Sequence, residues 1–66
     1  MIKREAEHLL EHWIEHNESH SKSFRERALQ IRDVSPAAAE AVLEAADLMD
    51  QSTLKLKKAF DALEKD

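Results

Sequence analysis

Four histidines recur at every fourth residue in the segment EHLLEHWIEHNESH, which spans residues 7–20. They are His8, His12, His16 and His20. Imidazole nitrogens bind transition metals, and imidazole also titrates near neutral pH. The row therefore allows three interpretations: a metal site, a proton-responsive surface, or a helix face that is simply rich in histidine.

The spacing limits how such a row can hold an ion. On a helix, residues four apart lie on neighbouring turns, so two adjacent histidines can share one ion. The outer two of three would be about 12 Å apart, whereas a Zn–N bond measures about 2 Å. Further ligands must then come from Glu15, from water, or from the same pair in a second copy. We predict His16 and His20 as the main metal ligands and His12 as an auxiliary one, and we expect His8 to matter least because it lies near a fraying end.

Composition narrows the class of protein. The chain has 66 residues, no glycine, no cysteine and one proline, and its abundance of Ala, Glu, Lys and Leu is typical of long helices and coiled coils. The absence of cysteine excludes disulfides and thiolate metal sites. No apolar signal region follows Met1, and no run could span a membrane, so we expect a cytoplasmic protein without membrane contact. A net charge of −4 argues against nucleic-acid binding.

One segment divides the chain. Ser35 is a favourable helix N-cap, and Pro36 suits the first helical position because its missing N–H is not needed there. So short a connection makes the two flanking helices antiparallel neighbours. We therefore predict a single all-α domain, 1–66, built from a helix at about 3–33, a turn at 33–36 and a helix at about 36–65.

The expected contact between these helices, here called the seam, follows alternating steps of four and three residues. On the first helix this spacing selects Ala6, Leu10, Trp13, Asn17, His20, Phe24, Ala28 and Ile31. On the second it selects Ala39, Val42, Ala46, Met49, Thr53, Leu56, Phe60 and Leu63. Antiparallel packing would place acidic residues of each helix beside basic residues of the other, which favours this alignment.

Two polar residues, Asn17 and Thr53, interrupt the predicted seam. They are expected to face each other across it. Buried polar residues can fix the register and oligomeric state of a coiled coil at some cost in stability. Alternatively, such residues line a small site between facing helices. The sequence leaves both interpretations open.

Several apolar residues lie outside the seam and need a partner surface: Leu9, Ile14, Leu43, Leu48 and Leu54. A hairpin of this length has one seam and no second layer. We predict a two-fold homodimer that forms a four-helix bundle. A larger assembly or a helical partner protein would also cover these side chains.

The segment from His12 through Trp13, His16, Asn17 and His20, continuing to Phe24 and Arg25, resembles the opening helix of a small family of bacterial and archaeal helical-hairpin proteins. In that family an HWIEHN-type helix precedes a second helix rich in Ala, Glu and Leu. The resemblance covers most of the chain, although only its first helix has a distinctive motif. It implies a compact hairpin with a connection to nickel or cobalt and implies no reaction.

Catalysis is not expected. The chain has no cysteine nucleophile, and its serines near His20 lie on a helix without the sharp turn or oxyanion hole that a serine nucleophile needs. We predict a non-enzymatic, homodimeric helical bundle that binds Ni, Co or Zn through the histidine row. The alternative is a structural or interaction module without metal, whose hairpin binds itself or a partner helix.

Overall fold

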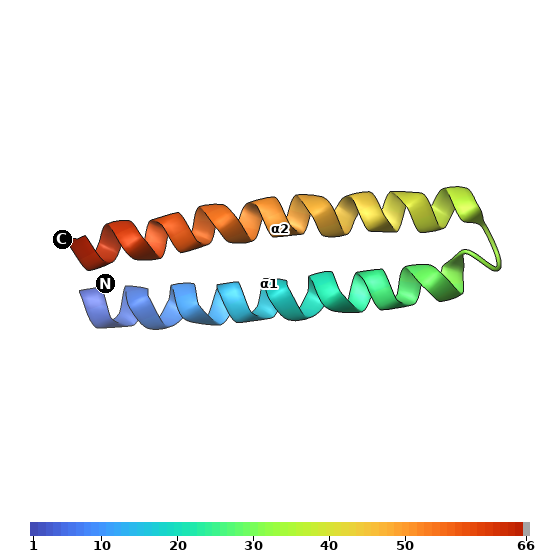
Figure 1. Ribbon diagram of the computed structural model, residues 1–66. Coiled ribbons are helices and arrows are strands. Elements are labelled where there is room, and N and C mark those ends of the chain that lie inside the picture. The colour runs from blue at the N-terminus through green and yellow to red at the C-terminus, as the bar shows by residue number, and fades with distance from the viewer. Residues whose placement is uncertain (66) are drawn as a thin grey trace.

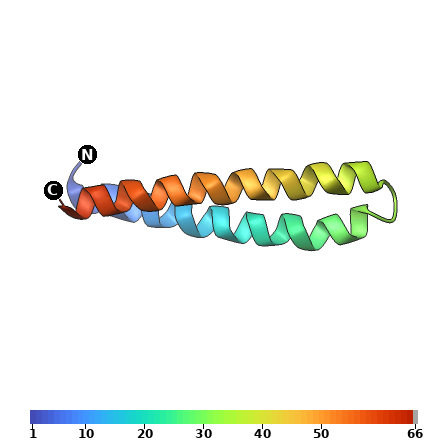
Figure 2. The same ribbon diagram turned by 45° about the horizontal axis from the view of Figure 1, so that its top comes forward.

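The computed structural model describes residues 1–65, which form two long helices, α1 (Lys3–Ile31) and α2 (Pro36–Lys65), and contain no strand. The helices run antiparallel, so both ends of the chain lie at the same end of the rod (Figure 1). Toward these ends α1 passes behind α2, which shows that the helices cross at a shallow angle (Figure 2). The predicted all-α hairpin is confirmed.

The turn between the helices is closed by backbone hydrogen bonds to the last residue of α1. The N–H groups of Val34 and Ser35 both donate to the Ile31 carbonyl, each at 2.9 Å. Because these bonds turn the chain back, α1 ends two residues before the predicted limit. The Ser35 hydroxyl then accepts a 3.1 Å bond from the Ala38 N–H, and Pro36 is the first residue of α2. The predicted N-cap is therefore confirmed.

The seam on α2 agrees with the predicted spacing. All eight predicted positions of this helix are buried or half-buried, and Ala39, Ala46 and Thr53 are the most deeply buried of them. A regular alternation of four and three thus identified the inward face of this helix.

On α1 the prediction was wrong at two positions. Ile14 and Ser21 lie in the seam, whereas Trp13 is 45 % exposed and His20 is exposed. The small side chain of Ser21 lets the helices approach closely, and its hydroxyl bonds to α2. Adjacent positions on a helix differ by about 100° in direction, so placing Ile14 and Ser21 inward turns Trp13 and His20 onto one side of the hairpin.

Only small side chains are buried in the described part of the chain. They are Ser21, Ala28, Ala39, Ala46 and Thr53, and no large side chain there is fully buried. The rod measures 48 × 14 × 14 Å, and its radius of gyration is 15.1 Å, against about 11 Å for a compact domain of this length. A single hairpin therefore has a contact seam but no hydrophobic core of large side chains.

An ion-pair network links the helices at mid-length. The Ser21 hydroxyl donates to Asp50 Oδ1 at 2.6 Å and accepts from Arg25 Nη1 at 2.5 Å. Arg25 Nη2 also donates to Asp47 at 2.9 Å and to Asp50 Oδ2 at 2.7 Å. Nearer the termini, Lys57 pairs with Glu18 at 3.2 Å. The predicted pairing of opposite charges across the hairpin is confirmed, and the network fixes one register because a shifted one would separate these groups.

The serine cap gives a first test of the fold. Ser35→Ala should lower the free energy of unfolding by about 1 kcal/mol, because the Ala38 N–H loses its acceptor. For a domain of this size that is roughly 4–8 °C in melting temperature. Ser23→Ala, at an exposed position within α1, is the matched control and should cause no loss. Equal melting temperatures for Ser35→Ala and wild type would contradict the cap.

Asp50 gives a test based on pH. Hydrogen bonds from Ser21 and then Arg25 hold the pKa of Asp50 below its ordinary value. A carboxyl group with a lowered pKa in the folded state stabilises the protein above its unfolded pKa, and this stabilisation is lost as the pH falls through the folded value. Asp50→Asn should therefore lower the melting temperature at pH 7, and its difference from wild type should shrink below about pH 4.

The matched control for this comparison is Asp61→Asn, which changes an exposed carboxylate on the same helix. It should have little effect at either pH. A destabilisation by Asp50→Asn that stayed constant from neutral to acid pH would show that the carboxylate charge is not what Ser21 and Arg25 stabilise.

Candidate functional site

The histidine row forms a ladder of rings along the exposed side of α1. The His12 and His16 rings are stacked with centroids 5.8 Å apart, and those of His16 and His20 meet edge to face at 4.4 Å. The ladder ends where His20 lies 6.2 Å from the ring of Phe24. His8 is exposed near the start of α1. The structure thus brings together most closely the two histidines that we predict as the main metal ligands.

One chain does not complete a metal site. Within residues 1–65, no three His, Asp or Glu side chains gather closely enough to hold one ion. Glu15, considered above as a further ligand, instead borders a groove on the other side of the hairpin. A single copy therefore offers an ion two imidazoles, and the other ligands must come from water or from another chain.

The side of the hairpin that carries these rings is here called the histidine flank. On a helical projection it comprises Leu9, Trp13, His16 and His20 of α1 with Leu48 and Ser52 of α2. None of the six carries a carboxylate, and Trp13 and Leu48 are 45 % and 65 % exposed. The flank combines solvent-exposed apolar surface with histidine and has no side chain that is negatively charged.

The opposite side, here called the ion-pair flank, has a different character. It comprises Glu18 and Arg25 of α1 with Asp50, Leu54 and Lys57 of α2. Leu54 is 61 % exposed, much as Leu48 is on the histidine flank. Glu18, Asp50 and Lys57 lie beside this leucine. Glu18 pairs with Lys57, and Asp50 pairs with Arg25, across the seam.

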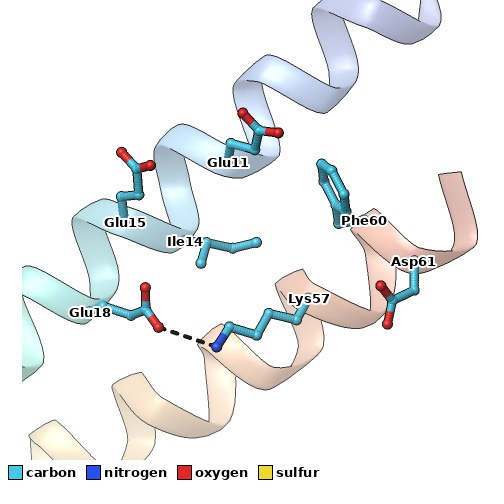
Figure 3. A pocket seen from close by; sticks show the side chains of 7 residues that line it. All are labelled: Glu11, Ile14, Glu15, Glu18, Lys57, Phe60 and Asp61. Atoms are coloured by element: carbon cyan, nitrogen blue, oxygen red, sulfur yellow. Dashed lines mark ion pairs between the residues drawn. The ribbon is translucent and has the colours of Figure 1, made fainter. Parts of the chain in front are cut away.

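Toward the termini, the ion-pair flank opens into a shallow groove of about 480 Å³. Ile14 and Phe60 lie on either side of it, and the carboxylates of Glu11 and Glu15 stand at its rim (Figure 3). Its other lining residues are Glu18, Lys57 and Asp61. Five of these seven side chains are charged, although most of the exposed lining is apolar. The groove, which the sequence did not predict, is open to solvent, whereas small-molecule sites enclose most of their ligand.

The two predicted polar residues lie at the middle of the hairpin. Thr53 is buried, and its hydroxyl donates to the Met49 carbonyl of its own helix at 3.0 Å. Asn17 is half-buried. The Thr53 hydroxyl is thus satisfied within α2, so the role of both residues in fixing register remains a prediction.

Comparison with known proteins places the chain in a family. The family described as "Domain of unknown function (DUF8180)" matches residues 6–63. An uncharacterised protein of Archaeoglobus fulgidus is 41 % identical over 54 residues, which are 82 % of this chain and 87 % of that protein. No solved structure matches the chain. The chain belongs to the DUF8180 family, and the expected membership of a small family of this kind is supported, whereas its HWIEHN motif and its nickel or cobalt connection remain expectations.

Glu64, near the end of α2, gives a further test. Partial loss of solvent, followed by repulsion from Glu7, raises the pKa of Glu64. A carboxyl group with a raised pKa in the folded state stabilises the protein only at low pH, and this contribution is lost as the pH rises through the folded value. Glu64→Gln should therefore raise the melting temperature at pH 7 and not at about pH 3.

A suitable control for Glu64→Gln is Glu26→Gln, which changes an exposed carboxylate in the second half of α1. The two variants should differ at pH 7 and converge in acid. A lower melting temperature for Glu64→Gln at pH 7 would contradict the proposed repulsion between carboxylates.

Proposed function

We propose that this DUF8180 protein is a non-enzymatic module, in which two hairpins form a four-helix bundle and bind a transition metal. The observation that carries the proposal is the His16–His20 pair, whose ring centroids lie 4.4 Å apart on an exposed flank beside Trp13. Two imidazoles at this distance suit the borderline ions Ni²⁺, Co²⁺ and Zn²⁺. The same flank offers apolar surface to a second copy.

Surface area supports the pairing of two hairpins. A compact protein of 7.6 kDa is expected to expose about 4,300 Å², whereas this chain exposes 5105 Å². The excess of roughly 800 Å² is about what one partner buries in a standard protein–protein interface. The side chains that such an interface would cover include Leu48, which is the most exposed large apolar residue within the helices at 65 %.

Two-fold symmetry would complete the metal site. A symmetric dimer presents the same surface of each copy to the other, so two His16–His20 pairs near the axis would supply four nitrogen ligands. Zinc in structural sites is usually four-coordinate. His12, stacked on His16, could orient that ring or replace one ligand. His8 lies two turns beyond His16 and would contribute least.

A metal-free interaction module is the second candidate. The exposed Trp13 and Leu48 favour a partner whether or not an ion binds, and an amphipathic helix of another protein could take the place of the second hairpin. The described helices include none long and apolar enough to cross a membrane. The chemistry of the serines gives no support to catalysis, since the Ser21 hydroxyl is already bonded to Arg25 and Asp50.

Thermal melting with and without Ni²⁺ or Zn²⁺ tests the metal site, using protein that carries no histidine tag. An ion that binds only the folded protein raises its melting temperature. Wild type and His8→Ala should therefore be stabilised, and the double variant His16→Ala with His20→Ala should not be. Binding requires neutral imidazole, so the stabilisation should also weaken in acid.

Two outcomes of this experiment would count against the metal. Equal stabilisation of all three proteins would reject His16 and His20 as the site. No stabilisation of wild type would leave the row as a helix face, and the interaction module would then be the better proposal. Calorimetric titration adds the stoichiometry, for which one ion per two chains is expected.

A further inference from the structure

The two flanks of the hairpin differ in what a second copy would have to desolvate. In a two-fold dimer each flank packs against its own equivalent. Packing the ion-pair flank on itself would bury Asp50, Arg25 and their counterparts, and removing charges from water is costly even when they are paired. The histidine flank has no carboxylate to desolvate, and its exposed apolar side chains gain from leaving water.

The residues of the histidine flank also suit a close contact. Trp13 is a large aromatic side chain, 45 % exposed, of the type enriched at the centres of interfaces. On α2, Ser52 is small, and Ala45 and Ala59 extend the same side at steps of seven residues. Small residues at this spacing let a neighbouring helix approach, so that bulky residues such as Trp13 can pack between helices.

We infer that a second copy of this chain packs on the histidine flank through a two-fold axis, covering Trp13 and Leu48 and leaving the ion-pair flank in solvent. The inference rests on the proposed dimer and adds the surface through which it forms. It brings His16 and His20 of each copy to the interface, which is what a shared metal site requires. The area available agrees with it, because the excess exposed surface of one hairpin is about one partner's share of a standard interface.

The chain offers a matched pair of leucines for the test. Leu48 and Leu54 are both on α2 and are 65 % and 61 % exposed. Six residue steps of about 100° put their directions about 120° apart around the helix axis, one on each side of the seam. Leu48→Glu places a carboxylate on the histidine flank, and Leu54→Glu places one on the ion-pair flank. Any general cost of the substitution to the helix is the same in both.

Mass should be measured by light scattering in the presence of EDTA, with helicity followed by circular dichroism. Leu48→Glu should weaken dimerisation by about a hundredfold or more, because each copy would bury an unpaired carboxylate. Leu54→Glu should keep the wild-type mass. The single tryptophan gives an independent readout: acrylamide should quench Trp13 more in Leu48→Glu than in wild type or Leu54→Glu.

The outcomes separate this inference from the proposal on which it depends. A dimeric wild type in which Leu54→Glu alone dissociates would overturn the chosen flank and leave the dimer standing. The chosen flank would also be overturned if both variants stayed dimeric or if both dissociated. It would be overturned as well if acrylamide quenched Trp13 in dimeric wild type as readily as in a dissociated variant. A wild-type monomer would overturn the dimer itself and this inference with it.

Discussion

Two helices share only one line of contact, and this constraint governs the rest of the molecule. Each helix turns a narrow stripe toward the other, and in this hairpin the stripe is filled at its closest points by Ser21, Ala28, Ala39, Ala46 and Thr53. Small residues bring the helices together but bury little apolar area, and burial of such area is the main source of stability. Several larger apolar side chains, among them Trp13, Leu48 and Leu54, are therefore left exposed on the two flanks, where they can be covered only by something outside the hairpin.

The two flanks differ in the residues that occupy them and therefore in the contacts they can make. On one side, Arg25 joins Ser21, Asp47 and Asp50 and holds the helices in register. Its charged groups are satisfied within the chain, and they make that side a poor surface for another copy. On the other side, no ion pair across the seam within residues 1–65 involves the imidazoles or Trp13, and this is the flank that we propose for assembly and for a metal.

Much of this fold could be predicted from spacing and turn chemistry. Ser35 and Pro36 identify the start of α2, and steps of four and three identify its inward face. The rotation of α1 about its own axis, here called its phase, could not be predicted in the same way. At two places the spacing allows either of two neighbouring residues to point inward: Trp13 or Ile14, and His20 or Ser21. Size and apolarity favour Trp13 and give no reason to choose Ser21. The structure selects Ile14 and Ser21, since a serine allows close approach and bonds to an aspartate on the facing helix. An arginine four residues after that serine, with aspartates opposite, is the signal in the sequence that could have identified this choice.

The candidate site was predictable only in part, for a related reason. Regular spacing indicates that neighbouring histidines can meet, and it shows that three cannot share an ion. It does not show which side of the hairpin the rings occupy, because that depends on the phase of α1. With the phase known, His16 and His20 fall on the flank that lacks carboxylates. The remaining ligands of the proposed metal site would be supplied by the proposed dimer, which a single chain does not contain.

We expect the hairpin to be stable only when its histidine flank is covered by a second copy. The most direct measurement is the melting temperature of wild type, in EDTA, over a hundredfold range of protein concentration. Because association stabilises the folded chains by mass action, the melting temperature should rise with concentration, and the mass should be twice the 7.6 kDa of one chain. A cooperative melt at a temperature independent of concentration, from a helical species of monomer mass, would contradict the account.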